Sequence, residues 1–191
     1  MANLFSISRR QKQSLIIMLV SLLSLWLIGG VLWIFGKEWR FLKYQNEAAG
    51  FSIRYPLRWS LQENQNGASV IFSSPVENKL DFFQENVNVV VADISQKPMS
   101  LVEYSQLAVN QMKVVFKENI EVIESGPTYL SGKPAHRFVY IGRGPEAELK
   151  FLMVWTIDEK VAYQVTYAAL ASTYDIYIKK IEKMIKSFEV L

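Results

Sequence analysis

Runs of β-branched and aromatic residues, bounded by Gly, Asn and Pro, recur along most of the chain and predict β-strands. In the second half of the chain, three such runs follow one another closely. Turns at Gly142–Pro145 and at Asp158-Glu159 would join them as antiparallel strands. Apolar residues occupy both faces of the last two runs, so both faces of the sheet should be covered. The predicted strands are Phe51–Tyr55, Ala68–Phe72, Val87–Ile94, Lys133–Ile141, Glu148–Ile157 and Lys160–Ala168.

Two segments with helical spacing of apolar residues predict the helices that cover this sheet. The first begins at Ser100, which forms a capping box with Glu103 so that each satisfies an otherwise unpaired amide. The second begins near Ser172–Asp175. The two apolar stripes are Leu101, Tyr104, Ala108, Met112 and Val115, and Tyr174, Ile178, Ile181, Ile185 and Phe188. This order of elements predicts an α+β fold in which an antiparallel β-sheet has helices on both faces, an α/β/α sandwich. The polar segment 62–67 is predicted to be a loop.

The longest apolar segment runs from Ser14 to Gly36, 23 residues without an ionisable side chain. As a helix it would span about 34 Å, enough to cross a hydrocarbon core of about 30 Å. We therefore expect one N-terminal transmembrane anchor. The predicted organisation is a basic tail over residues 1–13, the anchor over 14–36, a juxtamembrane link over 37–43 and one domain over 44–191.

Charge is distributed unevenly about this anchor. The chain has 21 Lys and Arg, 18 Asp and Glu and a net charge of +3, all of which comes from Arg9, Arg10 and Lys12. A basic flank of this kind stays in the cytoplasm, which predicts that the domain lies on the far side of the membrane, in a periplasm or outside the cell. The alternative is a removable signal peptide, but its apolar region is usually only about 7–15 residues long.

Residues that commonly carry catalysis or bind metals are few. The chain has no cysteine, which excludes disulfides, lipoprotein attachment, thiolate metal sites and cysteine catalysis. The single histidine, His136, shares a strand face with Phe138 and Tyr140, and we interpret it as structural. Ser125-Gly126 is predicted to be a turn, and the carboxylates lack the spacing of a calcium loop. We expect a protein that is not an enzyme and has no cofactor or metal site.

Two groups of residues are candidates for binding. One is a basic face of the second helix that would suit anionic headgroups or an acidic partner, formed by Lys179, Lys180, Lys183 and Lys186. Its alternative is an ordinary solvated face. The other is a candidate pocket between helix and sheet, bordered by Tyr104, Tyr163 and Tyr167, for which the alternative is a packed core. Nucleic acid binding is not expected, because residues 37–191 carry no net charge.

Several short motifs together resemble the PsbP-like domain family over roughly residues 44–190. They are Tyr44, Gly50–Pro56 with Trp59, Leu130–Ala135, Trp155-Thr156, Tyr163–Ala168 and Met184–Glu189. The resemblance implies a non-catalytic domain whose best known members are extrinsic lumenal subunits of photosystem II that help retain calcium and chloride. The resemblance thereby makes the thylakoid lumen a candidate location, photosystem II a candidate partner and calcium a candidate ligand. Unlike those subunits, this chain has a predicted permanent anchor, and it lacks the lipid-attachment cysteine of the cyanobacterial forms.

Two hypotheses about function follow. In the first, the protein is a non-catalytic, membrane-anchored binding or assembly module on the lumenal or periplasmic side, associated with photosystem II or another membrane complex. Tethering would raise its effective concentration near that complex. In the second, the domain senses or carries a small apolar molecule enclosed by helix and sheet.

Overall fold

Two antiparallel sheets and two α-helices make up the part of the chain that the computed structural model describes, residues 40–78 and 82–191. The helices are α2 (Leu101–Phe116) and α3 (Tyr174–Lys186), and a short 3-10 helix, η1 (Lys117–Asn119), follows α2. The strands are β1 (Phe41–Asn46), β2 (Phe51–Pro56), β3 (Ser60–Gln65), β4 (Ala68–Ser73), β5 (Asn86–Asp93), β6 (Ile120–Leu130), β7 (Lys133–Arg143), β8 (Glu148–Asp158), β9 (Val161–Leu170) and β10 (Glu189–Val190).

The larger sheet has seven strands in the order β3-β4-β5-β9-β8-β7-β6. All of its neighbouring strands run antiparallel, and β7, β8 and β9 form the consecutive hairpins that the sequence predicts. The smaller sheet has three strands in the order β1-β2-β10. The larger sheet therefore ends at β3 on one side and at the long strand β6 on the other.

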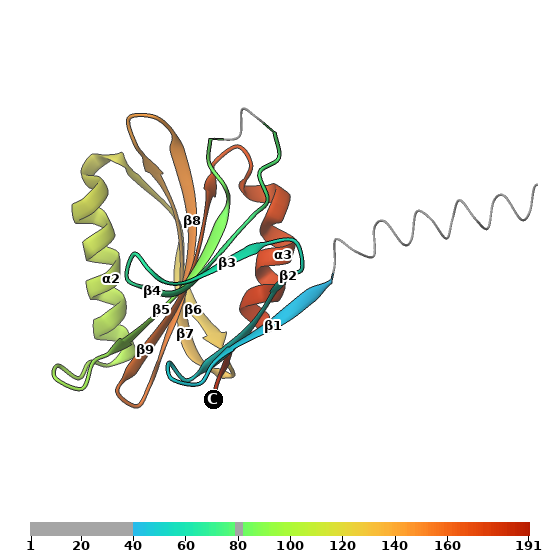
Figure 1. Cartoon of the computed structure of the whole chain (residues 1–191). Helices are drawn as coiled ribbons and strands as arrows, with labels where there is room; N and C mark the ends of the chain where they lie inside the picture. The colour runs from blue at the N-terminus through green and yellow to red at the C-terminus, as the bar shows by residue number, and fades with distance from the viewer. Residues whose placement is uncertain (1–39, 79–81) are drawn as a thin grey trace, which may run out of the picture. The chain divides into compact units, whose positions relative to one another are not determined.

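The two helices lie on opposite sides of the larger sheet (Figure 1), as the alternation of apolar residues predicts. On the α2 side, Ala108 packs in a cluster with Phe138 and Tyr140 of β7 and with Met153 and Trp155 of β8. On the α3 side, a larger core joins that helix to β2, β4, β5 and the central strands. The expected α+β architecture with helices on both faces is confirmed, with two sheets in place of one.

Local interactions set where α2 begins. The Ser100 hydroxyl accepts a hydrogen bond from the Glu103 backbone N–H at 3.3 Å, and the Glu103 carboxylate accepts one from the Ser100 N–H at 2.8 Å. The predicted capping box is therefore present. The helix ends at Phe116, and Lys117 adopts a positive φ of 50° as the chain turns towards β6.

Three sequence predictions about local structure are wrong. The segment 62–67 is not all loop, because β3 occupies most of it and only its end is a turn. Ser125-Gly126 is not a turn and lies within β6. Residues 41–43, assigned to the link, belong to β1. These segments lie in exposed strands at or near sheet edges, where polar residues are tolerated and the apolar pattern is weak.

The predicted anchor over 14–36 and its basic flank lie outside the described residues. Among the residues that are described, no helix combines the length and the hydropathy needed to cross a membrane.

Gly142 of β7 is a position where a side chain has no room. A Cβ atom built there would lie 2.3 Å from a ring carbon of Phe116. We expect Gly142→Ala to lower the free energy of unfolding by about 1–3 kcal/mol, because the Phe116 ring must leave its contacts with Tyr140 and Phe151. Gly126→Ala is the matched control, since no atom beyond those of its two chain neighbours lies within 4 Å of its Cβ position. Urea unfolding would measure both, and equal stabilities would contradict the expectation.

Candidate functional site

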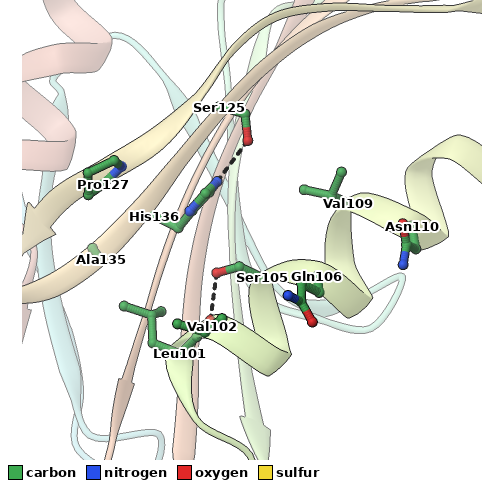
Figure 2. Close-up of a pocket in the computed structure, with 10 residues that line it drawn as sticks. All are labelled: Leu101, Val102, Ser105, Gln106, Val109, Asn110, Ser125, Pro127, Ala135 and His136. Atoms are coloured by element: carbon green, nitrogen blue, oxygen red, sulfur yellow. Dashed lines mark hydrogen bonds between the residues drawn. The ribbon is translucent and has the colours of Figure 1, made fainter.

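A groove of about 520 Å³ lies between α2 and the strands β6 and β7 (Figure 2). We call it the α2–β6 groove. Most of the side chains that line it are apolar or small, and none is an acid, a lysine or an arginine. They are Leu101, Val102, Ser105, Gln106, Val109, Asn110, Ser125, Pro127, Ala135 and His136.

The groove exists because α2 packs over β7 and β8 and leaves β6 partly open. In the β6–β7 ladder, Pro127 is opposite His136 and Ser125 is opposite Phe138. Directly paired residues point to the same face of a sheet. Because Phe138 packs in the α2 cluster, Ser125 and Pro127 also face the α2 side, where they remain exposed.

A chain of side-chain contacts builds the wall of the groove. His136 stacks on Trp155 with ring centroids 5.0 Å apart and an angle of 19° between the planes. The Trp155 indole Nε1 donates to the Ser105 hydroxyl at 2.8 Å, and Ser105 donates to the Leu101 carbonyl at 2.6 Å. The His136 Nε2 atom lies 2.9 Å from the Ser125 hydroxyl. These contacts hold His136 and Ser105 in place on the two sides of the groove.

The Ser125–His136 pair is a single hydrogen bond on the wall of the groove and does not form a triad. An imidazole that activates a hydroxyl is usually oriented by a third group. Among the described residues, Ser125 is the only side chain that hydrogen-bonds to His136. Burial lowers the pKa of His136 below its ordinary value of 6.5, so the groove is uncharged at neutral pH.

The lowered pKa of His136 makes stability depend on pH. The unfolded chain takes up a proton at a higher pH than the folded protein does, so acid favours unfolding. We expect the free energy of unfolding to fall as the pH drops through about 6.5 and to level off below the folded pKa. Urea unfolding of wild type and His136→Gln at pH 8 and pH 5 would measure this. The variant should lose less stability than the wild type, and an equal loss would contradict the expectation.

The three tyrosines predicted to border a pocket do not lie together. Tyr104 packs against the cluster on the α2 side, whereas Tyr163 and Tyr167 belong to the core on the α3 side. The Tyr167 hydroxyl donates to the Tyr174 carbonyl at 3.0 Å, and burial raises the pKa of Tyr167. Tyr163 and Tyr167 are therefore core residues of the opposite face and take no part in the α2–β6 groove.

The four lysines of the predicted basic face lie on α3, away from the groove. Lys179, Lys183 and Lys186 are exposed, and their spacing places them on one side of the helix. The Lys180 ammonium lies over the Tyr177 ring, 5.2 Å from its centroid. The predicted topology residues Arg9, Arg10 and Lys12 lie outside the described residues.

The sequence patterns did not reveal the α2–β6 groove. The local sequence predicts a turn at Ser125, and only the β6–β7 register places its hydroxyl beside His136. The one sequence pattern that involves this site is the alternation that places His136, Phe138 and Tyr140 on the same strand face. That pattern predicts that these side chains pack together, but it does not predict a groove. In the ranges 40–78 and 82–191, no group of three or more His, Asp or Glu side chains is arranged to hold a metal ion.

An antiparallel sheet between two helices, with an uncharged groove beneath α2, defines the α+β class of this domain. The sequence profile of the PsbP family matches residues 40–190. The chain belongs to the PsbP family, whose members are generally non-enzymatic. No curated protein matches the chain by sequence.

Solved structures with the same fold come from distant organisms. Cyanobacterial PsbP from Synechocystis sp. PCC 6803 has a TM-score of 0.60 at 17% identity, covering 79% of this chain and 92% of that one. LpqN of Mycobacterium tuberculosis, described as involved in cell envelope biogenesis, has a TM-score of 0.58 at 10% identity, covering 78% and 90%. The Saccharomyces cerevisiae Ran-binding protein Mog1p has a TM-score of 0.56 at 9% identity, covering 79% and 95%. At these identities the likeness concerns the fold alone.

Proposed function

We propose that this protein is a non-catalytic binding module, anchored by residues 14–36, which docks its PsbP-family domain onto a membrane protein complex on the lumenal or periplasmic side. The apolar segment and its basic flank support the anchor and the orientation. Membership of the PsbP family makes photosystem II one candidate complex. Docking of this kind requires no cofactor.

The observation that carries the proposal is a set of exposed apolar and aromatic side chains beside the α2–β6 groove. Register places Val122 and Tyr129 of β6 on the same side of the sheet as Pro127. The exposed fractions are 43% for Val122, 74% for Tyr129 and 66% for Val102 of α2. Exposed apolar side chains next to a groove are candidates for contact with a partner, and tyrosine is enriched among the residues that dominate binding energy.

Purification of the tagged full-length chain from mildly solubilised membranes tests this proposal. We expect a stoichiometric protein complex with the wild type and loss of that complex with Val102→Asp or Tyr129→Asp, because each buries a charge at the interface. Ile176→Asp is the matched control, since Ile176 is 61% exposed on α3. Retention of the partner by all three variants, or a wild type that purifies alone, would overturn the proposal.

Crosslinking in intact membranes followed by mass spectrometry tests the orientation. Lysines of the domain should crosslink to lumenal or periplasmic segments of the partner. Crosslinks only to cytosolic proteins would reverse the proposed orientation.

The volume of the α2–β6 groove favours a second candidate function, small-molecule binding. A volume of about 520 Å³ falls within the range of roughly 300–1,000 Å³ that is usual for ligand pockets. A sensing or carrier domain would purify as a monomer with a bound small molecule, in contrast to the stoichiometric complex expected above.

A further inference from the structure

The dimensions of the α2–β6 groove suit an extended polypeptide. The residues of α2 that line it run from Leu101 to Asn110, which corresponds to a length of about 13 Å along the helix. Dividing the volume of about 520 Å³ by this length gives a mean cross-section of roughly 40 Å². An extended chain in a packed sheet occupies about 48 Å², whereas a helix about 10 Å in diameter needs roughly 80 Å². The cross-section of the groove is thus closer to that of an extended chain than to that of a helix, and its length matches about four extended residues.

The charge of the groove restricts the occupant further. With His136 neutral, the residues that line it carry no formal charge. The guanidinium of the neighbouring Arg137 is engaged by Glu182 and Glu124, at 2.9 and 3.2 Å. A charged side chain in the groove would find no ionic partner among the residues that line it. The complementary segment is therefore uncharged.

Hydrogen-bonding groups along α2 suit a peptide main chain. Gln106 and Asn110 are exposed, one turn apart, and neither side-chain amide is hydrogen-bonded within the described part of the chain. Each amide offers both a donor and an acceptor, as a peptide bond does. On the other side of the groove, β6 is the edge strand, so part of its backbone has no neighbouring strand.

Exposure of the lining residues argues against a small molecule as the occupant. Val102, Gln106, Asn110, Ser125 and Pro127 are all exposed. A small ligand here would remain largely in water, whereas ligand pockets usually bury about 70–90% of their ligand. The exposed side chain of Tyr129 lies two residues beyond Pro127 on β6, which favours a chain that extends past this end of the groove.

Resting on the proposed function, we infer that the α2–β6 groove binds an extended, uncharged peptide segment of the partner protein. About four residues lie between α2 and β6. An apolar side chain packs against Val109 and His136, and the peptide main chain hydrogen-bonds to Gln106 and Asn110. The stacking of His136 on Trp155 preorganises this surface.

Selection from a phage-displayed library of random linear 12-residue peptides against the full-length chain in mild detergent tests the inference. We expect enriched peptides to share a run of about four uncharged residues with an apolar or aromatic anchor. The affinity of a synthetic peptide of this sequence should fall about 10-fold in the double variant Gln106→Ala/Asn110→Ala, because two hydrogen bonds are lost. Gln111→Ala is the control, an exposed amide on the same helix outside the groove, and it should leave the affinity unchanged.

Four results would overturn the inference. They are a charged consensus, a consensus with helical spacing of apolar residues, no enrichment, and equal affinities for wild type and double variant. The neutral dye N-phenyl-1-naphthylamine provides a further test. If the wild type binds it one-to-one, the double variant does not, and no peptide is enriched, the groove belongs to a small molecule and the peptide inference is overturned. If peptide selection fails while the native partner still depends on Val102 and Tyr129, the proposed docking stands and only the peptide inference is wrong.

Discussion

Replacing Trp155 with alanine is expected to lower the free energy of unfolding by about 3–5 kcal/mol, the range for removing a buried aromatic side chain. Trp155 is fully buried, stacks on His136 and donates its indole N–H to Ser105. Its loss would leave a cavity under α2 and remove a bond between that helix and β8. Because total stabilities are commonly only about 5–15 kcal/mol, much of the protein would unfold under mild stress.

Trp155→Phe is the comparison that separates packing from hydrogen bonding. Phenylalanine fills much of the space but cannot donate to Ser105, so we expect a smaller loss of about 1–2 kcal/mol. Urea unfolding followed by circular dichroism would measure both variants. If alanine proved no more destabilising than phenylalanine, packing under α2 would contribute little to stability.

Replacing Glu85 with alanine is expected to lower the free energy of unfolding by about 3 kcal/mol, because hydrogen bonds to a charged group are each worth roughly 1.5–3 kcal/mol. Glu85 is only 3% exposed, although charged residues are seldom buried. Its carboxylate accepts hydrogen bonds from Ser74 at 2.9 Å and from Thr173, the residue before α3, at 2.6 Å. The Glu85 side chain therefore links Ser74, directly after β4, to Thr173, directly before α3.

Two further variants make this expectation specific. Glu146→Ala removes an exposed carboxylate, and we expect a change within about 0.5 kcal/mol. Glu85→Gln keeps the side-chain volume and one acceptor oxygen. Its free energy of unfolding should lie between those of Glu85→Ala and Glu146→Ala. Thermal and urea unfolding would rank the three variants, and a Glu85→Ala protein as stable as Glu146→Ala would show that the buried carboxylate does not stabilise the fold.

The centre of the fold could be predicted because its signals are local. β7, β8 and β9 carry apolar residues on both faces, and the turns between them lie next to them in the sequence. The capping box at Ser100 needs only four consecutive residues. Such patterns act over a few residues and do not depend on distant partners.

The edge strands could not be predicted in the same way. β6 contains Glu121, Gly126 and Pro127, residues that normally weaken or end a strand. Proline is tolerated at an edge because its missing N–H costs no bond where no neighbouring strand exists. β6 is a strand because it pairs with β7 along nearly its whole length, an interaction that no local pattern records.

The candidate site depends on similar long-range pairing. Ser125 and His136 meet across two strands, and Ser105 meets Trp155 at a separation of 50 residues. The three tyrosines expected around one pocket are separated for the same reason: Tyr104 borders a pocket between α2 and the sheet, whereas Tyr163 and Tyr167 lie in the core of the other face. Residue type predicts that an aromatic ring is buried, but the face of the sheet that buries it depends on register.

By itself the sequence determined the central strands, the two helices, the neutral balance of residues 37–191 and the lack of cysteine chemistry. Only the tertiary structure decided which strands lie at the edges, how the strands divide into two sheets, and where α2 leaves β6 uncovered to form a groove. The physical reason is the sequence separation over which each interaction acts. Propensity, periodicity and capping act among neighbours in sequence, whereas a sheet edge and a groove are created by contacts between segments that burial of the whole core brings together.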